Sequence, residues 1–357
     1  MTNLSWIGAL WSFLCNSTGP LYACINSKID DRYTILIAGI LSSLSMMLAS
    51  ITHEIWGLYL SQGALAGLTA SLIYYPCINQ VLVTFSNRRS MALGMSMAGI
   101  GIGSLVFSNI ATACFSTVGY RWSLRIIGFI QLVLCTIAAL SCVKLKSYFS
   151  TRGVSFWNMD VFRSKRFWIL LGAHFIGPFA FYIPSAFIAP YAGSIGMDAW
   201  SIANISGLVG VFKSVGSVIF GYLADRFIGR FNMGVVAGSL GVISFLAIWL
   251  TATTPAAVWT FAALYGIAEG TLTDMMITVI VDCVGLERSN AGTGWALFLW
   301  CFGGLLGQPL ASVLVNNTET PDYKPAIIFA AMLYVVTTLL MLSLRVLFGR
   351  WKVFIKV

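Results

Sequence analysis

Three ionisable residues stand inside long apolar stretches of the chain. Lys213 and Glu269 each lie near the middle of such a stretch, and Asp274 follows Glu269 by five residues. A charge in mid-bilayer costs about 2.5–3.5 kcal/mol, so such residues are functional candidates. Two interpretations are open. Either Lys213 attracts an anion while Glu269 or Asp274 carries a proton, or Lys213 and Glu269 form a structural ion pair between two helices.

His174 is a lone histidine in the apolar stretch 167–190. A hydrogen-bonded structural histidine is the more common case, and a proton relay is the alternative. No Cys/His cluster indicates a metal site, and no phosphate-binding loop indicates an ATP-driven pump. We therefore expect neither a cofactor nor a metal, and no enzyme site is visible.

Composition identifies the elements that must hold these charges. The chain is 58% hydrophobic and only 9% charged, whereas a soluble domain carries about 25% charged residues. Its net charge of +9 indicates no nucleic-acid partner, because the basic residues sit in short loops between apolar runs. The composition predicts an all-α polytopic membrane protein whose solvent is the lipid bilayer.

Segments long enough to cross a bilayer can be counted directly, since a spanning helix needs roughly 20 apolar residues. Eleven spans are predicted, at 4–25, 33–52, 56–85, 90–115, 122–143, 167–190, 201–223, 232–252, 256–284, 290–315 and 326–348.

The loop charges predict the orientation. If the N-terminus is outside, nearly all Lys and Arg residues fall in inside loops, which is the distribution that membrane topology follows. The sequence Asn316-Asn317-Thr318 then lies in an outside loop, where Asn316 is a candidate glycosylation site.

Repeated features connect the two halves. The stretch Gly221-Tyr-Leu-Ala-Asp-Arg-Phe-Ile-Gly-Arg230 resembles the loop motif G-x-L-x-D-R-x-G-R of the major facilitator superfamily. In that motif the acid and the arginines bridge two helix ends, so the resemblance implies a cytoplasmic gating loop of Asp225, Arg226 and Arg230. The counterpart at 19–32 has Ser27 where the motif has Asp.

Further segments narrow the resemblance to a fungal-type member of the monocarboxylate-porter family. They fit in order along almost the whole chain: Ser5–Gly8, Gly19–Leu21, Leu58–Leu60, Tyr74–Pro76, Asn87–Gly94, Gly103–Phe107, Gly119–Trp122, Leu264–Gly266 and Gly303–Pro309.

The resemblance implies a two-bundle fold with twelve helices in full-length relatives. It begins at the family's second helix, so we expect about eleven spans here, without the first. The family often has an arginine where Ser217 stands. Lys213 lies four residues earlier, on the same helix face, and keeps a cation there, so Ser217 joins the expected substrate or proton path.

The expected domains are an N-terminal bundle at 1–143, a cytoplasmic loop at 144–166 and a C-terminal bundle with a short tail at 167–357.

The resemblance implies a secondary transporter of a small, monocarboxylate-like organic anion, with or without a coupled proton, working by alternating access. Two alternatives are open. One is an efflux carrier for a fungal secondary metabolite or vitamin-like compound, and the other is a truncated membrane protein that does not transport. The plasma membrane is the expected location, with a vacuolar or other internal membrane as the alternative.

Overall fold

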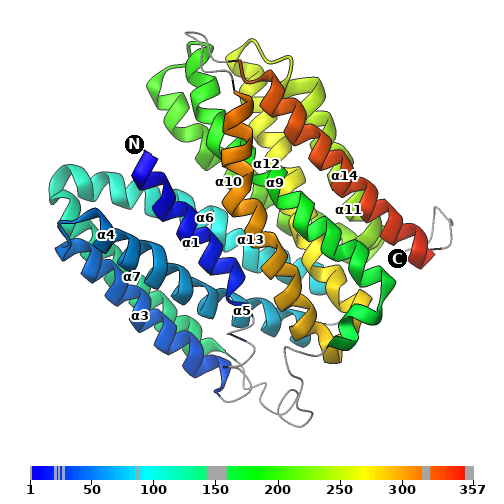
Figure 1. Cartoon of the computed structure of the whole chain (residues 1–357), viewed down its shortest axis with the longest axis horizontal. Helices are drawn as coiled ribbons and strands as arrows, with labels where there is room; N and C mark the ends of the chain where they lie inside the picture. Colours follow the sequence, from blue (N-terminus) through cyan, green and yellow to red (C-terminus); the bar gives the residue numbers. More distant parts are fainter. Residues whose placement is uncertain are drawn as a thin grey trace.

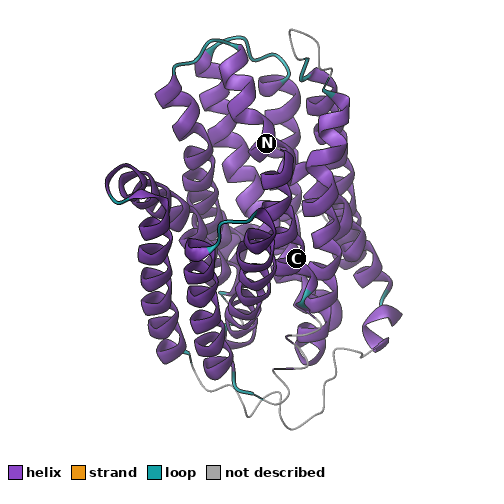
Figure 2. Ribbon diagram, turned by 60° about the vertical axis from the view of Figure 1, so that its left-hand side comes forward, coloured by secondary structure: helices purple, strands orange, loops and turns teal. Residues whose placement is uncertain are grey.

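The computed structural model describes residues 2–19, 22, 25, 29–85, 88–142, 159–315 and 322–349, and these residues form a bundle of long helices (Figures 1 and 2). The helices are α1 (Thr2–Ser17), α3 (Asp31–Ile51), α4 (Ile55–Leu58), α5 (Ala66–Thr84), α6 (Arg89–Thr117), α7 (Gly119–Ser141), α9 (Lys165–Ser194), α10 (Ala199–Leu223), α11 (Arg230–Ile243), α12 (Pro255–Val284), α13 (Ser289–Leu314) and α14 (Lys324–Gly349). A π-helical stretch, Tyr59–Leu65, joins α4 to α5, and two others, Ala224–Ile228 and Ser244–Trp249, extend α10 and α11.

Each of the eleven predicted spans overlaps one of these helices or a continuous run of them, so the polytopic helical prediction is confirmed, although α1 ends at Ser17 and part of the predicted span 4–25 lies outside the described residues. Among the described residues, nine helices are long and apolar enough to cross a membrane. The other two predicted spans correspond to α1, which has 16 residues, and α12. Helix α12 is buried on all sides from Gly270 to Val281, so it lies inside the protein rather than against lipid.

The helices pack in two groups (Figure 1). In the first half, α3 packs against α7 and α5; in the second, α9 packs against α13 and α14, and α11 against α12 and α14. The main contacts between the groups are α6 with α10 and α1 with α13. This packing agrees with a two-bundle arrangement. The linker proposed at 144–166 falls largely outside the described residues, so the domain boundaries remain a prediction.

Glycines bring α10 unusually close to two neighbours. A Cβ atom on Gly94 of α6 would lie 2.1 Å from the Ser217 carbonyl oxygen, and one on Gly270 of α12 would lie 2.4 Å from the Lys213 carbonyl oxygen. Neither position has room for a side chain, and glycine at helix interfaces is the usual way for backbones to approach closely. Helix α10 is therefore clamped between α6 and α12 at Lys213 and Ser217.

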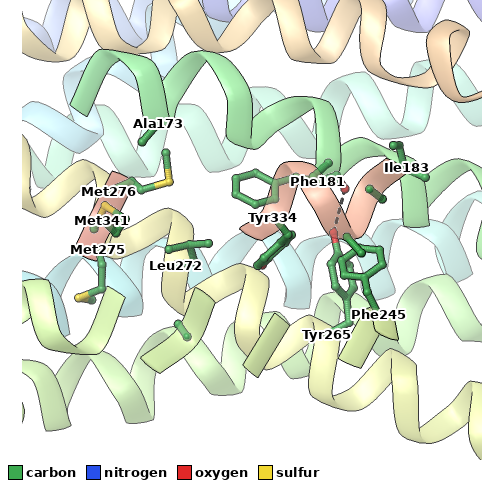
Figure 3. Close-up of a cluster of buried hydrophobic side chains, with 14 of the residues drawn as sticks. Ala173, Phe181, Ile183, Phe245, Tyr265, Leu272, Met275, Met276, Tyr334 and Met341 are labelled. Carbon is green, nitrogen blue, oxygen red and sulfur yellow. Dashed lines mark hydrogen bonds between the residues drawn. The ribbon is translucent and has the colours of Figure 1, made fainter. Parts of the chain in front are cut away.

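An aromatic core fixes α12 on its other side (Figure 3). The Tyr265 hydroxyl donates a hydrogen bond of 2.9 Å to the Phe181 carbonyl oxygen of α9. The Tyr265 ring lies 5.4 Å from that of Phe245 and 6.4 Å from that of Tyr334, centroid to centroid. These rings hold α9, α12 and α14 in register one turn from Glu269.

Candidate functional site

Lys213 and Glu269, the central pair of the predicted site, are in direct contact. The Lys213 Nζ donates to Glu269 Oε1 at 2.6 Å across the α10–α12 interface. Lys213 lies deep among the helices, yet 32% of its side chain is exposed, against 12% for Glu269. The ammonium is therefore paired with Glu269, while part of the Lys213 side chain is exposed.

Asp274 lies beside this pair, fully buried at 1% exposure. The groups that interact with its carboxyl are the Ser217 hydroxyl, the Lys213 ammonium and the Glu269 carboxyl. Neither Asp274 Oδ2 nor Ser217 Oγ has a hydrogen-bond partner among the described residues. The structure thus gathers four of the five predicted path residues in one place and leaves two polar atoms unsatisfied there.

Four tyrosines surround these charges, and the sequence analysis assigned none of them a role. Tyr182 of α9 is near Lys213, and Tyr74 of α5 is near Asp274 and Tyr182. Tyr265 and Tyr334 are both near Glu269. The only signals were Tyr74 and Tyr265, which lie in family-like segments, since hydropathy does not indicate which aromatic side chains converge.

His174, the fifth predicted path residue, has different neighbours. It is fully buried, its Nδ1 lies 3.0 Å from the Leu170 carbonyl oxygen, and its ring meets Trp300 at a centroid distance of 6.0 Å. Its Nε2 has no hydrogen-bond partner in the described part of the chain. These contacts are within the core of the second group, which favours the structural interpretation.

The loop predicted to act in gating belongs to the second group and contacts the first. Asp225 Oδ2 accepts a hydrogen bond of 2.9 Å from the Met91 backbone N–H in the first turn of α6. Asp225 Oδ1 accepts from Arg230 Nε at 3.2 Å, and Arg230 also pairs with Asp282 of α12 at 3.3 Å. Asp282 is 3.5 Å from Arg89 of α6. Arg89 of the first group and three charges of the second group therefore meet at this end of the molecule.

Arg226, the third predicted loop residue, contacts different residues. Its side chain donates to the Tyr222 hydroxyl at 2.5 Å and lies near the faces of Tyr222 and Phe227, 5.8 Å and 5.4 Å from the ring centroids. Arg89 and Asp282 take part in the charge network, and the sequence analysis did not select them. Their only signal was position, at helix ends predicted to lie on the same side of the membrane.

An apolar cluster lies behind this charge network and joins the two groups. Asn79 of α5 donates to Asn290 Oδ1 of α13 at 3.0 Å beside it. We call the apolar residues the inter-group seal: Tyr22, Tyr75, Ile78, Leu82 and Leu93 from the first group, and Ile277, Val281 and Leu297 from the second. The charges and the seal together join the two groups at the end of the molecule that the loop charges predict to face the cytoplasm.

The remaining predicted positions lie outside the described residues. They are the glycosylation candidate Asn316 and the degraded-motif residue Ser27. Within the described residues, no group of three His, Cys, Asp or Glu side chains is arranged to hold a metal ion.

Relatives of this chain are transporters by name. It is 28% identical to the MFS-type transporter opdF of Penicillium oxalicum, over 100% of this chain and 84% of that one. Identity is 24% to human monocarboxylate transporter 11, over 92% and 72%, and 25% to the aspyridones efflux protein apdF of Emericella nidulans, over 88% and 64%.

Solved structures share the fold. The E. coli fucose:proton symporter FucP superposes with a TM-score of 0.75 at 15% identity, over 96% of this chain and 91% of that one. The human organic anion transporter MFSD10 gives a TM-score of 0.75 at 12% identity, over 94% and 82%. The model of the Major Facilitator Superfamily matches residues 1–308. With that match, the repeated halves and the charge-bearing loop between α10 and α11, the chain belongs to the Major Facilitator Superfamily.

Proposed function

We propose that this protein is a secondary transporter of a small organic anion, driven by a coupled proton. The observation that carries the proposal is the Lys213–Glu269 pair, at 2.6 Å with 32% of the lysine side chain still exposed. An intramembrane charge on a side chain that is partly exposed is suited to a ligand of opposite charge. A relative named monocarboxylate transporter 11 agrees with this substrate class.

Binding on this proposal is an exchange of partners at Lys213. A substrate carboxylate approaches the ammonium and competes with Glu269 for its protons. Tyr182, near Lys213, contributes a hydroxyl to the same space. Breaking the internal pair leaves a carboxylate that needs a new donor. The Tyr334 hydroxyl is near Glu269 and has no hydrogen-bond partner among the described residues, so it is available for that purpose.

Alternating access follows from the closed end. In this conformation the inter-group seal and the Asp225 network block the predicted cytoplasmic side, so the site is reached from the opposite side. Rocking the two groups about the site requires the Met91–Asp225 and Arg89–Asp282 contacts to break, because each joins one group to the other. Asp225 and Arg230 then act as the gate, together with Arg89 and Asp282.

The second candidate is efflux of a fungal secondary metabolite. It is supported by the similarity to an aspyridones efflux protein, over 88% of this chain. The same cation and gate serve either cargo. The size of the cargo and the direction of the ion gradient distinguish the two.

The test is uptake into proteoliposomes holding the purified protein. Labelled pyruvate, lactate and acetate are offered with the outside more acidic, and again at equal pH. Accumulation that needs the gradient and is lost in Lys213→Gln supports the proposal. No uptake of any of these acids in either condition contradicts it and leaves efflux of a larger compound as the candidate.

A further inference from the structure

Asp274 stands apart from Glu269 in what surrounds its carboxyl group. Both acids lie on α12 near one cation, but only Glu269 is in direct contact with Lys213, at 2.6 Å. Asp274 is 1% exposed, and its Oδ2 has no hydrogen-bond partner among the described residues. The two acids are therefore not equivalent, and one of them lacks a counter-ion.

Charge balance identifies the missing partner. The charged groups that interact with Asp274 are Lys213 and Glu269, and the titratable phenol of Tyr74 lies near it on α5. With both acids ionised, this interior holds two negative charges against one positive charge. A buried charge without a partner is strongly disfavoured. One proton restores neutrality, and it belongs on the acid that has no ion pair.

Ser217 is the hydroxyl-bearing neighbour of this carboxyl group. Its hydroxyl interacts with the Asp274 carboxyl, yet Ser217 Oγ is also without a hydrogen-bond partner in the described part of the chain. An ionised carboxylate can only accept hydrogen bonds, whereas a protonated one can also donate. A protonated Asp274 could therefore donate to Ser217 Oγ or accept from it, which would satisfy both atoms.

The position along α12 links this proton to the conformational change. Asp274 lies about 7.5 Å beyond Glu269 at 1.5 Å per residue, on the side of the closed end. Ile277 of the inter-group seal follows three residues later on the same helix face. Tyr74 belongs to the other helix group, so the surroundings of Asp274 include both groups. Opening the seal exposes Asp274 to the predicted cytoplasmic side, where the proton leaves.

We propose that Asp274, hydrogen-bonded to Ser217, is the binding site of the coupled proton, and that Glu269 is the internal counter-ion that holds Lys213 until the substrate anion arrives. This division of roles rests on the proposed function. The proton is taken from the outer solution in the closed-seal conformation and released to the cytoplasm when the seal opens, so one proton crosses for each occupied cycle.

The direct test is infrared difference spectroscopy of the reconstituted protein during a pH titration without substrate. A buried protonated carboxyl gives a C=O stretching band that a carboxylate lacks. The band is expected in the parent protein and in Glu269→Gln, and it is expected to be lost in Asp274→Asn. In Ser217→Ala it is expected to shift, because the hydrogen bond is removed. A band that survives in Asp274→Asn and disappears in Glu269→Gln overturns the assignment, as does the absence of any band at all pH values.

Two further measurements keep the test decisive. If Asp274→Asn does not fold, Asp274→Glu retains a titratable group in altered geometry, and an unchanged band in that variant contradicts the assignment. Transport is followed with labelled pyruvate, and loss of gradient-driven accumulation in Asp274→Asn supports proton coupling at this residue. If the parent protein moves no pyruvate, the proposed substrate class fails, while the spectroscopic result still decides where the proton binds.

Discussion

The Asp225 carboxylate accepts a hydrogen bond from the Met91 backbone N–H at 2.9 Å, so an acid of the second helix group caps the first turn of a helix in the first group. The first turn of a helix carries unpaired N–H groups and partial positive charge, which favours a carboxylate there. Asp225 is nearly buried, with 4% of its side chain exposed. The contact exists only while the two groups are closed at this end.

Asp225→Asn is expected to weaken this closure without preventing membrane insertion. The amide keeps the shape but loses the charge, and a hydrogen bond to a charged group contributes about 1.5–3 kcal/mol. The ratio of closed to open molecules should fall by roughly tenfold or more, since about 1.4 kcal/mol is a factor of ten in an equilibrium constant. Labelling of a cysteine introduced at Leu93 of the seal measures the opening. Ser27→Ala is the matched control in the degraded loop copy, and equal effects at both positions would show that the repeat assignment is wrong.

Arg89→Gln is expected to act through the same closed end. Arg89 is 8% exposed and pairs with Asp282 of the other helix group, besides donating to the Leu82 carbonyl oxygen. Its loss leaves buried acceptors unsatisfied, which costs about 1–3 kcal/mol. The control is Arg163→Gln, because Arg163 pairs with Asp160 on the surface at 84% and 42% exposure, where such pairs contribute little. Cysteine labelling at the seal should rise in the first variant only. A similar rise in both would indicate a general effect of removing positive charge.

A third prediction concerns packing at the α6–α10 interface. Gly94→Ala should destabilise the protein by about 1–3 kcal/mol, as overpacked sites do, because its Cβ would lie 2.1 Å from the Ser217 carbonyl oxygen. Gly103→Ala in the same helix is the control, since its Cβ would meet nothing within 4 Å. Thermal unfolding of the purified variants in detergent checks this. Equal midpoints would mean that α6 does not pack on α10 at Gly94.

Single residues show how much of the fold and of the site could be predicted from the sequence. Hydropathy predicts where the long helices lie, and nine of them among the described residues are long and apolar enough to cross a membrane. It does not show that α12 is enclosed by other helices, because that depends on packing. The Lys213–Glu269 contact was also predictable, since both charges sit at similar depth and few alternatives exist inside a membrane. The partner of Asp282 was not predictable, because its contacts with Arg89 and Arg230 depend on how two helix groups close against each other.

The positions of the tyrosines near the site could not be predicted from the sequence either. Tyr182 and Tyr334 lie on different helices, and their convergence on Lys213 and Glu269 follows from helix rotation within the bundle. Neutral aromatic residues in apolar spans carry no pattern that separates lining side chains from core side chains. Buried charges are informative because they are costly, whereas buried tyrosines are common.

The central claim, that Lys213 binds the substrate anion, is tested by variants that separate folding from transport. Lys213→Gln alone leaves Glu269 buried without its partner, so lower expression is expected, and breaking a buried pair costs about 3–5 kcal/mol. Adding Glu269→Gln removes the unpaired charge and should restore expression. Lys213→Arg should retain part of the transport, because it keeps the positive charge.

The decisive measurement is the pyruvate transport rate per folded molecule of the double variant Lys213→Gln/Glu269→Gln in proteoliposomes. The account predicts that expression and thermal stability return toward those of the parent protein while pyruvate transport stays absent, because the cation that binds the carboxylate is missing. Restored stability together with transport at the parent rate would contradict the account and would reduce the Lys213–Glu269 contact to a structural ion pair.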